Sequence, residues 1–356
     1  MTTPRIAITM GDPAGIGPEI IAKAVRRLAP RLEAGELTVL VVGTESCMAE
    51  ATDRLGLPRL PRVEDGPLPP VGLLEAATAE APIQLGAVSA EAGRLAYRAI
   101  EAAAKLAMSG EVGAIVTAPL NKEALNLAGH AYAGHTELLA DLTGARDSVL
   151  MLVHDQLRVS HVTAHCALAD VPRRATPARL RRVIELTHDA LRRMGFERPR
   201  IGVAALNPHA GEGGLFGRED IEVTAPVVAA CRDEDGFDVE GPVPADTVFV
   251  KARAGRYDGV VAMYHDQGHI AVKLLGFSVD PATGRWTEVS GVNVTLGLPI
   301  VRTSVDHGTA FDIAGRGIAS EASLIDAIEV ALRLAPPSPA PDHPAARGGA
   351  GRLTAA

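Results

Sequence analysis

Short apolar runs alternate with longer amphipathic stretches along this chain. The apolar runs at residues 5–10, 37–42 and 112–116 are predicted to be strands. Helical composition, with few Gly or Pro residues, covers residues 87–108, 177–193, 220–231 and 319–334, and a further helix opens at Pro18 and Glu19. Strands that alternate with helices predict an α/β protein with a mostly parallel sheet and helices on its faces.

The length of 356 residues exceeds one ordinary hydrophobic core. We therefore expect a single catalytic unit of two α/β lobes over residues 1–335. Residues 57–85 are rich in Pro, Leu and Glu and are expected to form irregular surface with short strands. Residues 336–356 are rich in Pro, Ala and Gly and are expected to be a disordered tail.

Composition narrows the class of protein. The chain is 47% hydrophobic and 22% charged, with a net charge of −8 and only 3% aromatic residues, which disfavours a nucleic-acid surface. The first residues lack the apolar core of a signal peptide, and no apolar run is long enough for a membrane span. The odd set of three widely spaced cysteines predicts free thiols in a reducing cytoplasm, although Cys166 beside His165 stands out.

Three histidines share one local pattern. His165, His209 and His265 each lie where a short apolar, strand-like run gives way to Gly, Pro or polar residues. The carboxyl ends of strands are where open α/β sheets bind ligands, and three imidazoles there could hold a divalent metal with one open position. A lone histidine is more often structural, but the repetition favours a metal site.

Other residues near these histidines have less certain roles. His161 and His269 each lie four residues from one of the three and are weaker ligand candidates. Asp266 and Asp246 could accept hydrogen bonds from metal-binding imidazoles and so fix their tautomers, or could simply cap turns.

Two groups of residues suit an anion. Thr136 is a candidate N-cap beside His135, and Lys122 lies upstream, so a helix N-terminus could bind a phosphate here. Lys273 and Arg302 lie in apolar company and need a partner, which is either a bound phosphate or carboxylate or an internal Asp or Glu.

Two glycine-rich segments are candidate ligand loops. Residues 10–19 follow a strand and open a helix, but they match neither GxGxxG nor a Walker A loop, and close helix packing explains them equally well. Residues 306–317 form a polar loop before the last helix, where glycines permit close approach of the backbone to a ligand.

Together these segments closely resemble the 4-hydroxythreonine-4-phosphate dehydrogenase family and its D-threonate and D-erythronate 4-phosphate dehydrogenase paralogues. The resemblance extends over essentially residues 4–335, and the segments that carry it are 9–19, 116–144, 207–217, 242–247, 263–268, 292–299 and 302–317. It implies a two-lobed isocitrate/isopropylmalate dehydrogenase-like fold that binds NAD in a cleft without a Rossmann fingerprint. It also implies a homodimer whose metal site is completed across the subunit interface.

The resemblance assigns roles residue by residue. The implied metal ligands are His165, His209 and His265, for Zn, Co, Mg or Mn. The implied substrate-binding residues are His135, Thr136, Lys273, Asn293 and Arg302. The implied cofactor residues, for NAD with NADP as the alternative, are Asp306, His307, Gly308, Thr309, Asp312 and Gly315. Lys273, Asp246 and Asp266 are the candidate catalytic residues, with Lys273 or Asp246 as the base.

The implied reaction is NAD-dependent, metal-assisted oxidation and decarboxylation of a 4-phosphorylated 3-hydroxy acid. The first expectation is 4-hydroxythreonine 4-phosphate, giving 3-amino-2-oxopropyl phosphate and CO2. The alternatives are D-threonate or D-erythronate 4-phosphate giving dihydroxyacetone phosphate, an aromatic cis-dihydrodiol carboxylate, or an NAD- or metal-binding sensor without catalysis.

One segment departs from the vitamin B6 enzymes. Residues 278–291 look like an insertion with a hairpin turn at 281–284 and the only tryptophan, Trp286. This extension, together with Gly268 and His269, looks more like the D-threonate and D-erythronate branch. A surface hairpin without effect on specificity is the competing interpretation.

Overall fold

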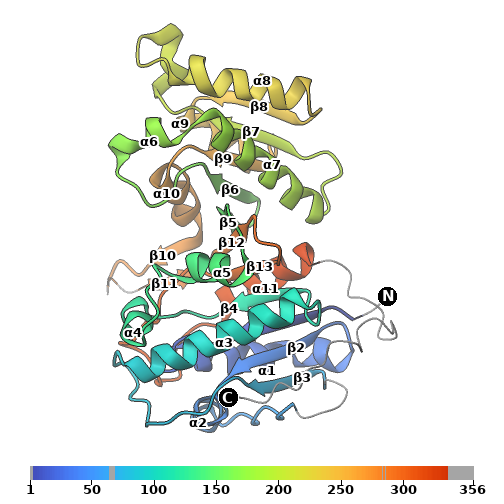
Figure 1. Cartoon of the computed structure of the whole chain (residues 1–356), viewed down its shortest axis with the longest axis vertical. Helices are drawn as coiled ribbons and strands as arrows, with labels where there is room; N and C mark the ends of the chain where they lie inside the picture. Colours follow the sequence, from blue (N-terminus) through green and yellow to red (C-terminus); the bar gives the residue numbers. More distant parts are fainter. Residues whose placement is uncertain (1–2, 64–68, 283, 285, 336–356) are drawn as a thin grey trace.

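The computed structural model describes residues 3–63, 69–282, 284 and 286–335. Two lobes are stacked along the long axis and meet at a narrower waist (Figure 1). One 11-stranded sheet runs through both lobes in the order β3-β2-β1-β4-β13-β12-β5-β6-β9-β7-β8. The two-lobed α/β architecture expected from the sequence is therefore confirmed.

The lower lobe holds the N-terminal strands and the last strand and helix. Its strands are β1 (Arg5–Thr9), β2 (Thr38–Gly43), β3 (Val71–Glu75), β4 (Ala114–Thr117) and β13 (Arg302–Val305). Its helices are α1 (Gly17–Glu33), α2 (Glu45–Leu55), α3 (Ala90–Met108), α4 (Lys122–Leu127), α5 (His135–Thr143) and α11 (Ala322–Leu334).

The upper lobe continues the sheet. Its strands, with those of the waist, are β5 (Val149–His154), β6 (Leu157–His161), β7 (Arg200–Ala204), β8 (Asp238–Val243), β9 (Gly259–Ala262) and β12 (Val292–Leu296). Its helices are α6 (Val171–Arg174), α7 (Pro177–Arg193), α8 (Ala225–Asp233), α9 (Ala245–Arg253) and α10 (His265–Gly276). Short helical turns cover Leu168–Asp170, Pro208–Gly214 and Asp220–Thr224.

Burial on both faces explains the apolar runs. Ile6 and Ile8 of β1 pack into the core shared with α1, whereas Ala7 between them packs into the core beneath α3. A strand covered on both sides has no solvent face, so its residues read as a continuous apolar run rather than an alternating one.

The waist reverses the strand direction. The pairings β13–β12, β12–β5 and β5–β6 are antiparallel, while the other strands of the large sheet pair in parallel. Three successive reversals set β6 antiparallel to β13. The carboxyl ends of the lower-lobe strands therefore lie at one edge of the sheet, and those of β6, β9 and β7 lie at the opposite edge.

Several expected boundaries shift. The stretch expected as one helix over 220–231 begins with the π-type turn Asp220–Thr224 and continues as α8 to Asp233. The last helix begins at Ala322 rather than at residue 319. The tail expected at 336–356 lies outside the described residues.

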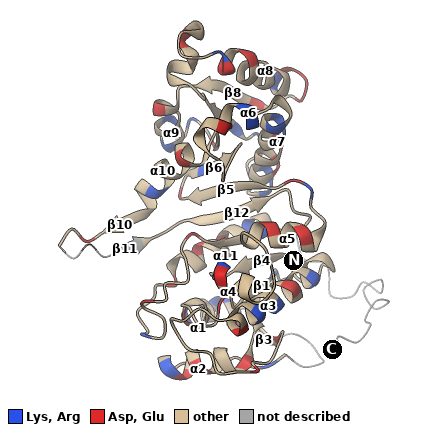
Figure 2. Cartoon of the chain, turned by 60° about the vertical axis from the view of Figure 1, so that its left-hand side comes forward, with Lys and Arg blue, Asp and Glu red and all other residues tan. Residues whose placement is uncertain are grey.

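The insertion at 278–291 forms a hairpin that projects away from the body (Figure 2). Strand β10 (Phe277–Val279) pairs antiparallel with β11 (Trp286–Val289). At the turn, the Gly284 N–H donates to the Asp280 carbonyl over 2.8 Å, and Gly284 adopts a φ of 68°. Thr283 of the expected turn lies outside the described residues.

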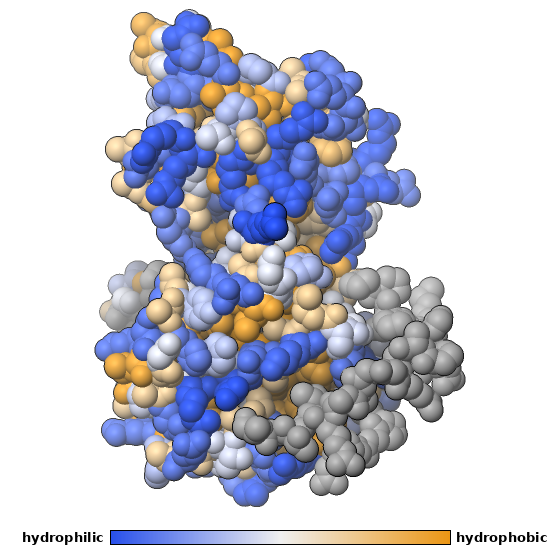
Figure 3. Space-filling model, viewed as in Figure 1, coloured by the Kyte–Doolittle hydropathy of each residue, from blue (hydrophilic) through white to orange (hydrophobic). Residues whose placement is uncertain are grey.

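On the face shown in Figure 3, hydrophilic residues predominate on both lobes, with hydrophobic patches between them. Within the described ranges, no helix combines the length and apolar character that a membrane crossing requires.

Candidate active site

A cleft of about 610 Å³ lies between the lobes, over one face of the waist strands. Helices α3 and α5 cover this face in the lower lobe, and α9 and α10 cover it in the upper lobe. The strands left uncovered between them form the floor of the cleft. Ten of the expected site residues line it: His135, Thr136, His165, His265, Lys273, Asn293, Arg302, Asp306, His307 and Gly308.

Strand register explains which polar side chains share this floor. Thr295 pairs with Arg302 and Asn293 pairs with Ser304 across β12 and β13. Thr117 of β4 pairs with Ser304 on the other side. Because alternate residues of a strand face the same side, these side chains converge on the cleft while Val294 and Thr303 face the opposite core.

Arg302 is a buried cation at the lower end of the floor. Its side chain donates to Thr295 Oγ1 over 3.0 Å and to Thr117 Oγ1 over 2.8 Å, and the residue is only 4% exposed. Its Nε finds no partner among the described residues. Burial lowers the pKa of Arg302 to about 10, opposed by the charge of Glu137. A guanidinium held by hydroxyls alone is short of negative charge, which an anionic ligand would supply.

The first turn of α5 faces the same point. His135 begins this helix, and its Nε2 is buried without a partner in the described part of the chain. Burial and then the charge of Arg302 hold the pKa of His135 well below its usual range, so the ring is neutral. The free amides of a helix N-terminus attract anions, and Thr136 adds a hydroxyl there.

Four histidines cluster at the upper end of the cleft. The rings of His265 and His269 stack with centroids 3.6 Å apart, and the ring centroid of His165 lies 5.8 Å from that of His265. The ring centroid of His161 lies 4.7 Å from that of His269. Burial lowers the pKa of His161 to about 3 and that of His269 to about 4. The two histidines rated as weaker candidates from the sequence are thus part of the cleft.

Asp266 fixes the tautomer of His265. The carboxylate Oδ1 of Asp266 lies 2.7 Å from His265 Nδ1, and a carboxylate accepts, so Nδ1 carries the proton. His265 Nε2 is then left with a lone pair, which is the state that a metal ligand requires. This is the partner role that the sequence suggested for Asp266, and Asp266 itself is not among the cleft-lining residues.

Lys273 belongs to a small polar network. Its Nζ lies 3.6 Å from Asp306 Oδ2, and Asn293 Nδ2 donates to Asp306 Oδ1 over 2.9 Å. The network brings residues from α10, β12 and the loop after β13 to one point in the cleft.

His209 lies elsewhere. It is exposed and is not among the residues that line the cleft, although β7 ends at the same sheet edge as β6 and β9. The segment after β7 carries it away, with His209, Ala210 and Glu212 all in the left-handed backbone region. In the described residues, no three His, Cys, Asp or Glu side chains of one chain form a metal cluster. Asp246, at the exposed start of α9, also lies outside the cleft lining.

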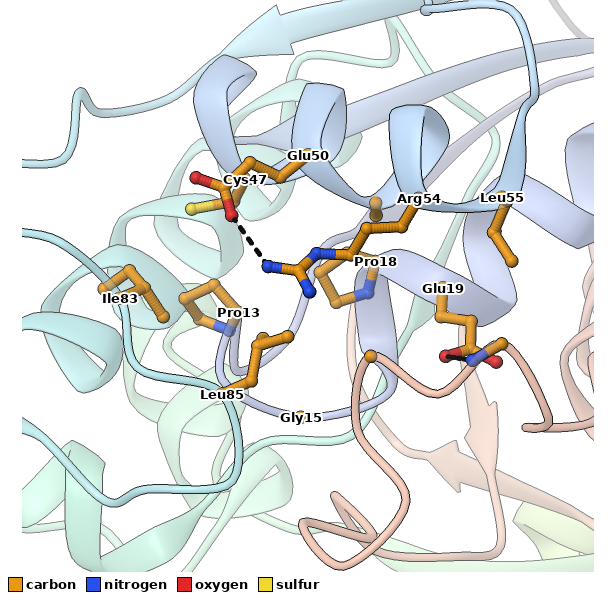
Figure 4. Close-up of a pocket in the computed structure, with 13 residues that line it drawn as sticks. Pro13, Gly15, Pro18, Glu19, Cys47, Glu50, Arg54, Leu55, Ile83 and Leu85 are labelled. Atoms are coloured by element: carbon orange, nitrogen blue, oxygen red, sulfur yellow. Dashed lines mark hydrogen bonds and ion pairs between the residues drawn. The ribbon is translucent and has the colours of Figure 1, made fainter.

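The two glycine-rich segments pack on each other. The Ile16 N–H donates to the Thr309 carbonyl over 3.0 Å, and a Cβ on Gly15 would lie 2.8 Å from that oxygen. Glu19 accepts from the Gly317 and Ala319 amides and so fixes the end of the 306–317 loop. Beside this contact is a small pocket lined by Gly15, Arg54, Leu85 and Gly315, where Arg54 points toward Glu50 (Figure 4). Thr309 and Asp312 line neither this pocket nor the main cleft.

Asp12 gives this segment a pH-dependent stability. Its Oδ1 accepts from the Ala14 amide, its Oδ2 is buried without a described partner, and burial raises its pKa from 3.8 to about 6. A raised carboxyl pKa stabilises the fold at low pH, and that stability is lost as the pH rises through about 6. We expect Asp12→Asn to recover about 3 kcal/mol at pH 8 and nothing at pH 4. Thermal melts of both proteins at the two pH values test this, and equal differences in Tm would contradict it.

Comparison with known proteins gives a consistent result. The family model described as "Pyridoxal phosphate biosynthetic protein PdxA" matches residues 35–331. A Bradyrhizobium diazoefficiens protein named "Putative D-threonate 4-phosphate dehydrogenase" is 61% identical, over 94% of this chain and 98% of its own. A 4-hydroxythreonine-4-phosphate dehydrogenase from Beijerinckia indica is 49% identical, over 94% and 96%. The crystal structure of 4-hydroxythreonine-4-phosphate dehydrogenase from Klebsiella pneumoniae has a TM-score of 0.78 and 46% identity, over 93% and 98%.

Proposed function

Because the chain belongs to the PdxA family of pyridoxal phosphate biosynthetic proteins, we propose that its cleft oxidises a 4-phosphorylated 3-hydroxy acid and releases its carboxyl group as CO2. NAD is the proposed hydride acceptor, and D-threonate or D-erythronate 4-phosphate is the proposed acid. The expectation of a dehydrogenase is confirmed by the names of the relatives. The observation that carries the substrate class is Arg302 Nε, which is buried without a partner among the described residues, in the cleft that the first turn of α5 also lines.

The phosphate belongs at this lower end. Arg302 Nε has a proton to donate, and the α5 amides and Thr136 add further donors. Phosphate oxygens accept from all of them, and the phosphate charge offsets the buried guanidinium. Fixing the phosphate here places the rest of the substrate along the floor toward His265 and Lys273, which contributes orientation.

The reacting hydroxyl belongs at the upper end. His265 Nε2, oriented through Asp266, and His165 are the residues of this chain that would hold a divalent metal. A metal bound there would polarise the hydroxyl oxygen and lower its pKa. Lys273 and Asp306 form the pair that can move a proton at this point, and Lys273 can stabilise the enolate charge that develops as CO2 leaves. We therefore favour Lys273 over Asp246 as the acid–base residue.

The third imidazole, in our proposal, comes from a second copy of the chain. His209 lies outside its own cleft, while α10 exposes Ile270 by 67% and Leu274 by 79% on one face. These residues are one helical turn apart and leave an apolar stripe uncovered. A homodimer that covers this stripe and brings His209 of the partner subunit to the cleft would complete three histidines.

The cofactor is assigned to the two packed glycine-rich loops. Asp306, His307 and Gly308 line the main cleft, and Gly315 lines the small pocket beside the residues 10–17 loop. The same loop thus touches both cavities. We propose that NAD follows it, with the hydride-accepting end in the main cleft.

The choice of acid follows from two observations. The relative at 61% identity is named a putative D-threonate 4-phosphate dehydrogenase. The chain also has the projecting β10–β11 hairpin and, in the cleft, His269, the two features that resemble the D-threonate and D-erythronate branch. 4-Hydroxythreonine 4-phosphate remains the second candidate, because relatives at 49% identity carry that name.

The test is NADH formation by the metal-loaded dimer with each acid in turn. We expect turnover with D-threonate or D-erythronate 4-phosphate, weaker turnover with 4-hydroxythreonine 4-phosphate, and none with an aromatic cis-dihydrodiol acid. Turnover of the unphosphorylated acid at the same rate would overturn the assignment of Arg302 and His135 to a phosphate.

A further inference from the structure

We propose that Arg179 is a positioning residue, which holds the segment that carries His165 in the place where this histidine can bind the metal. The proposal rests on the proposed function, because it concerns a ligand of the metal assigned there. Arg179 lies in the first turn of α7, and its side chain lines the main cleft, as do Ala164 and His165.

Arg179 bridges the ends of two neighbouring strands. β5 begins at Val149 and β6 ends at His161, and these two strands pair antiparallel. Ser148 and Val162 are therefore the first residues beyond the two strands at this end. Arg179 Nε donates to the Val162 carbonyl over 2.9 Å, and Nη2 donates to the Ser148 carbonyl over 3.0 Å. The guanidinium thus joins the two strand ends where the strands themselves stop.

The third nitrogen of the guanidinium is also held. Nη1 donates to the carboxylate of Asp147, with which Arg179 forms an ion pair. A guanidinium is planar and presents its donors in fixed directions, so these three contacts together define its position. The ammonium of a lysine has no such planar set of donors and would not reproduce the arrangement.

The segment that Arg179 holds leads directly to the metal ligand. Thr163 is buried, whereas His165, two residues later, is exposed. Thr163 donates to the Met263 carbonyl through its amide over 3.2 Å and through its hydroxyl over 2.8 Å, and Met263 comes two residues before His265. Thr163 therefore ties the segment to the end of β9, while Arg179 ties it to the start of β5. Together these contacts set the separation of the two imidazoles.

Removing the guanidinium would release one side of this segment. Val162 is 1% exposed, and its carbonyl would lose the donor that Arg179 supplies. Because a buried carbonyl without a donor is costly, the segment would move toward another donor, and His165 would move with it. A metal site requires its ligand distances to within about 0.2 Å, so the metal affinity should fall although every ligand is still present.

The test measures the binding of Co²⁺ to the full-length protein without substrate or NAD, by calorimetry and by visible absorption. We expect the Kd of Co²⁺ to rise about 10-fold in Arg179→Ala. The Kd of inorganic phosphate, which belongs to the other end of the cleft, should stay unchanged. Saturation with Co²⁺ should restore most of kcat, a recovery that a mere loss of stability would not give.

Arg181→Ala is the matched control. Arg181 lies on the same helix with its side chain 35% exposed, against 26% for Arg179, and it pairs with Glu234 and Asp235. It is not among the residues that line the cleft, so its removal should leave the Kd of Co²⁺ unchanged.

Free guanidinium ion provides a second readout. At a low, non-denaturing concentration it can occupy the place between the two carbonyls and Asp147 in Arg179→Ala. It should therefore lower the Kd of Co²⁺ toward the wild-type value in this variant and have no effect on Arg181→Ala. A Kd that guanidinium ion leaves unchanged in Arg179→Ala would count against the bridge.

A lysine variant keeps the proposal testable if Arg179→Ala does not fold. Arg179→Lys retains the charge beside Asp147 without the planar set of donors, so the Kd of Co²⁺ should still rise several-fold. An unchanged Kd in Arg179→Lys would then overturn the proposal.

The outcomes separate this proposal from the one on which it rests. A wild-type protein that binds no Co²⁺ overturns the metal site of the proposed function, and the role of Arg179 with it. A wild-type protein that binds Co²⁺, together with an Arg179→Ala variant of unchanged Kd, overturns the role of Arg179 alone.

Discussion

A heterodimer that joins one His209→Ala subunit with one His265→Ala subunit should have about half of the wild-type turnover, while each homodimeric variant is nearly inactive. The reason is the position of His209 outside its own cleft. If the partner subunit supplies this imidazole, one of the two sites in the heterodimer holds all three intact histidines and the other lacks two. Each single variant should lose roughly 1,000-fold or more in kcat, because a metal contributes several kcal/mol to such a step.

The experiment uses co-expression with two different tags and purification through both. The matched control joins His165→Ala with His265→Ala, which lie 5.8 Å apart in the cleft of one chain. That heterodimer has one altered histidine in each of its two sites and should stay nearly inactive, and a double variant His209→Ala/His265→Ala paired with the wild type should also lose both sites. Failure of the first heterodimer to recover, together with about half of the wild-type turnover when the double variant is paired with the wild type, would show that the partner subunit does not supply His209.

The second result we expect concerns Arg302. Replacing it by Met should lower kcat/KM for the phosphorylated acid by roughly 1,000-fold, because hydrogen bonds to a charged partner and the buried phosphate charge are both lost. The unliganded protein should nevertheless be at least as stable as the wild type. Arg302 is 4% exposed, and among the described residues its hydrogen bonds go to the hydroxyls of Thr117 and Thr295 and to no carboxylate, so its removal relieves a buried charge that lacks a directly bonded counter-ion there.

Thermal melts with and without inorganic phosphate measure both halves of this expectation. Phosphate should raise the Tm of the wild type and leave that of Arg302→Met unchanged. Arg256→Met, which removes an exposed arginine paired with Glu240, is the control and should respond to phosphate like the wild type. Protection of Arg302→Met by phosphate equal to that of the wild type would place the anion elsewhere.

Much of the fold follows from local patterns. Strands covered on both faces leave unmistakable apolar runs, and the long helices carry few breakers. The antiparallel strand pairs at the waist were not predicted from the sequence, because residues 294–301 form one apolar run with no evident break between two strands. Gly297, with a φ of 87°, and Pro299 in fact turn the chain between β12 and β13. The alternation of Asn293 and Thr295 with Val292 and Val294 is the signal that identifies a strand with one polar face.

The types of residue in the candidate site could be predicted from the sequence, but which of them reach the same cleft could be predicted only in part. His165 and His265 reach the cleft because β6 and β9 are neighbours with carboxyl ends at one edge. His209 follows the next strand, yet its left-handed segment leads away, which no periodicity reveals. Thr117 and Thr295, which hold Arg302, come from strands distant in sequence and meet only through register. Such contacts are set by tertiary pairing rather than by local propensity.

The most direct test of the proposed chemistry follows both products of one substrate. D-Threonate 4-phosphate labelled with 13C at its carboxyl carbon is incubated with the metal-loaded protein and NAD. The account predicts that NADH and labelled CO2 form in equal amounts, with dihydroxyacetone phosphate as the other product, and that a chelator stops all three until metal is restored. NADH without labelled CO2, or a rate that removal of the metal leaves unchanged, would contradict it.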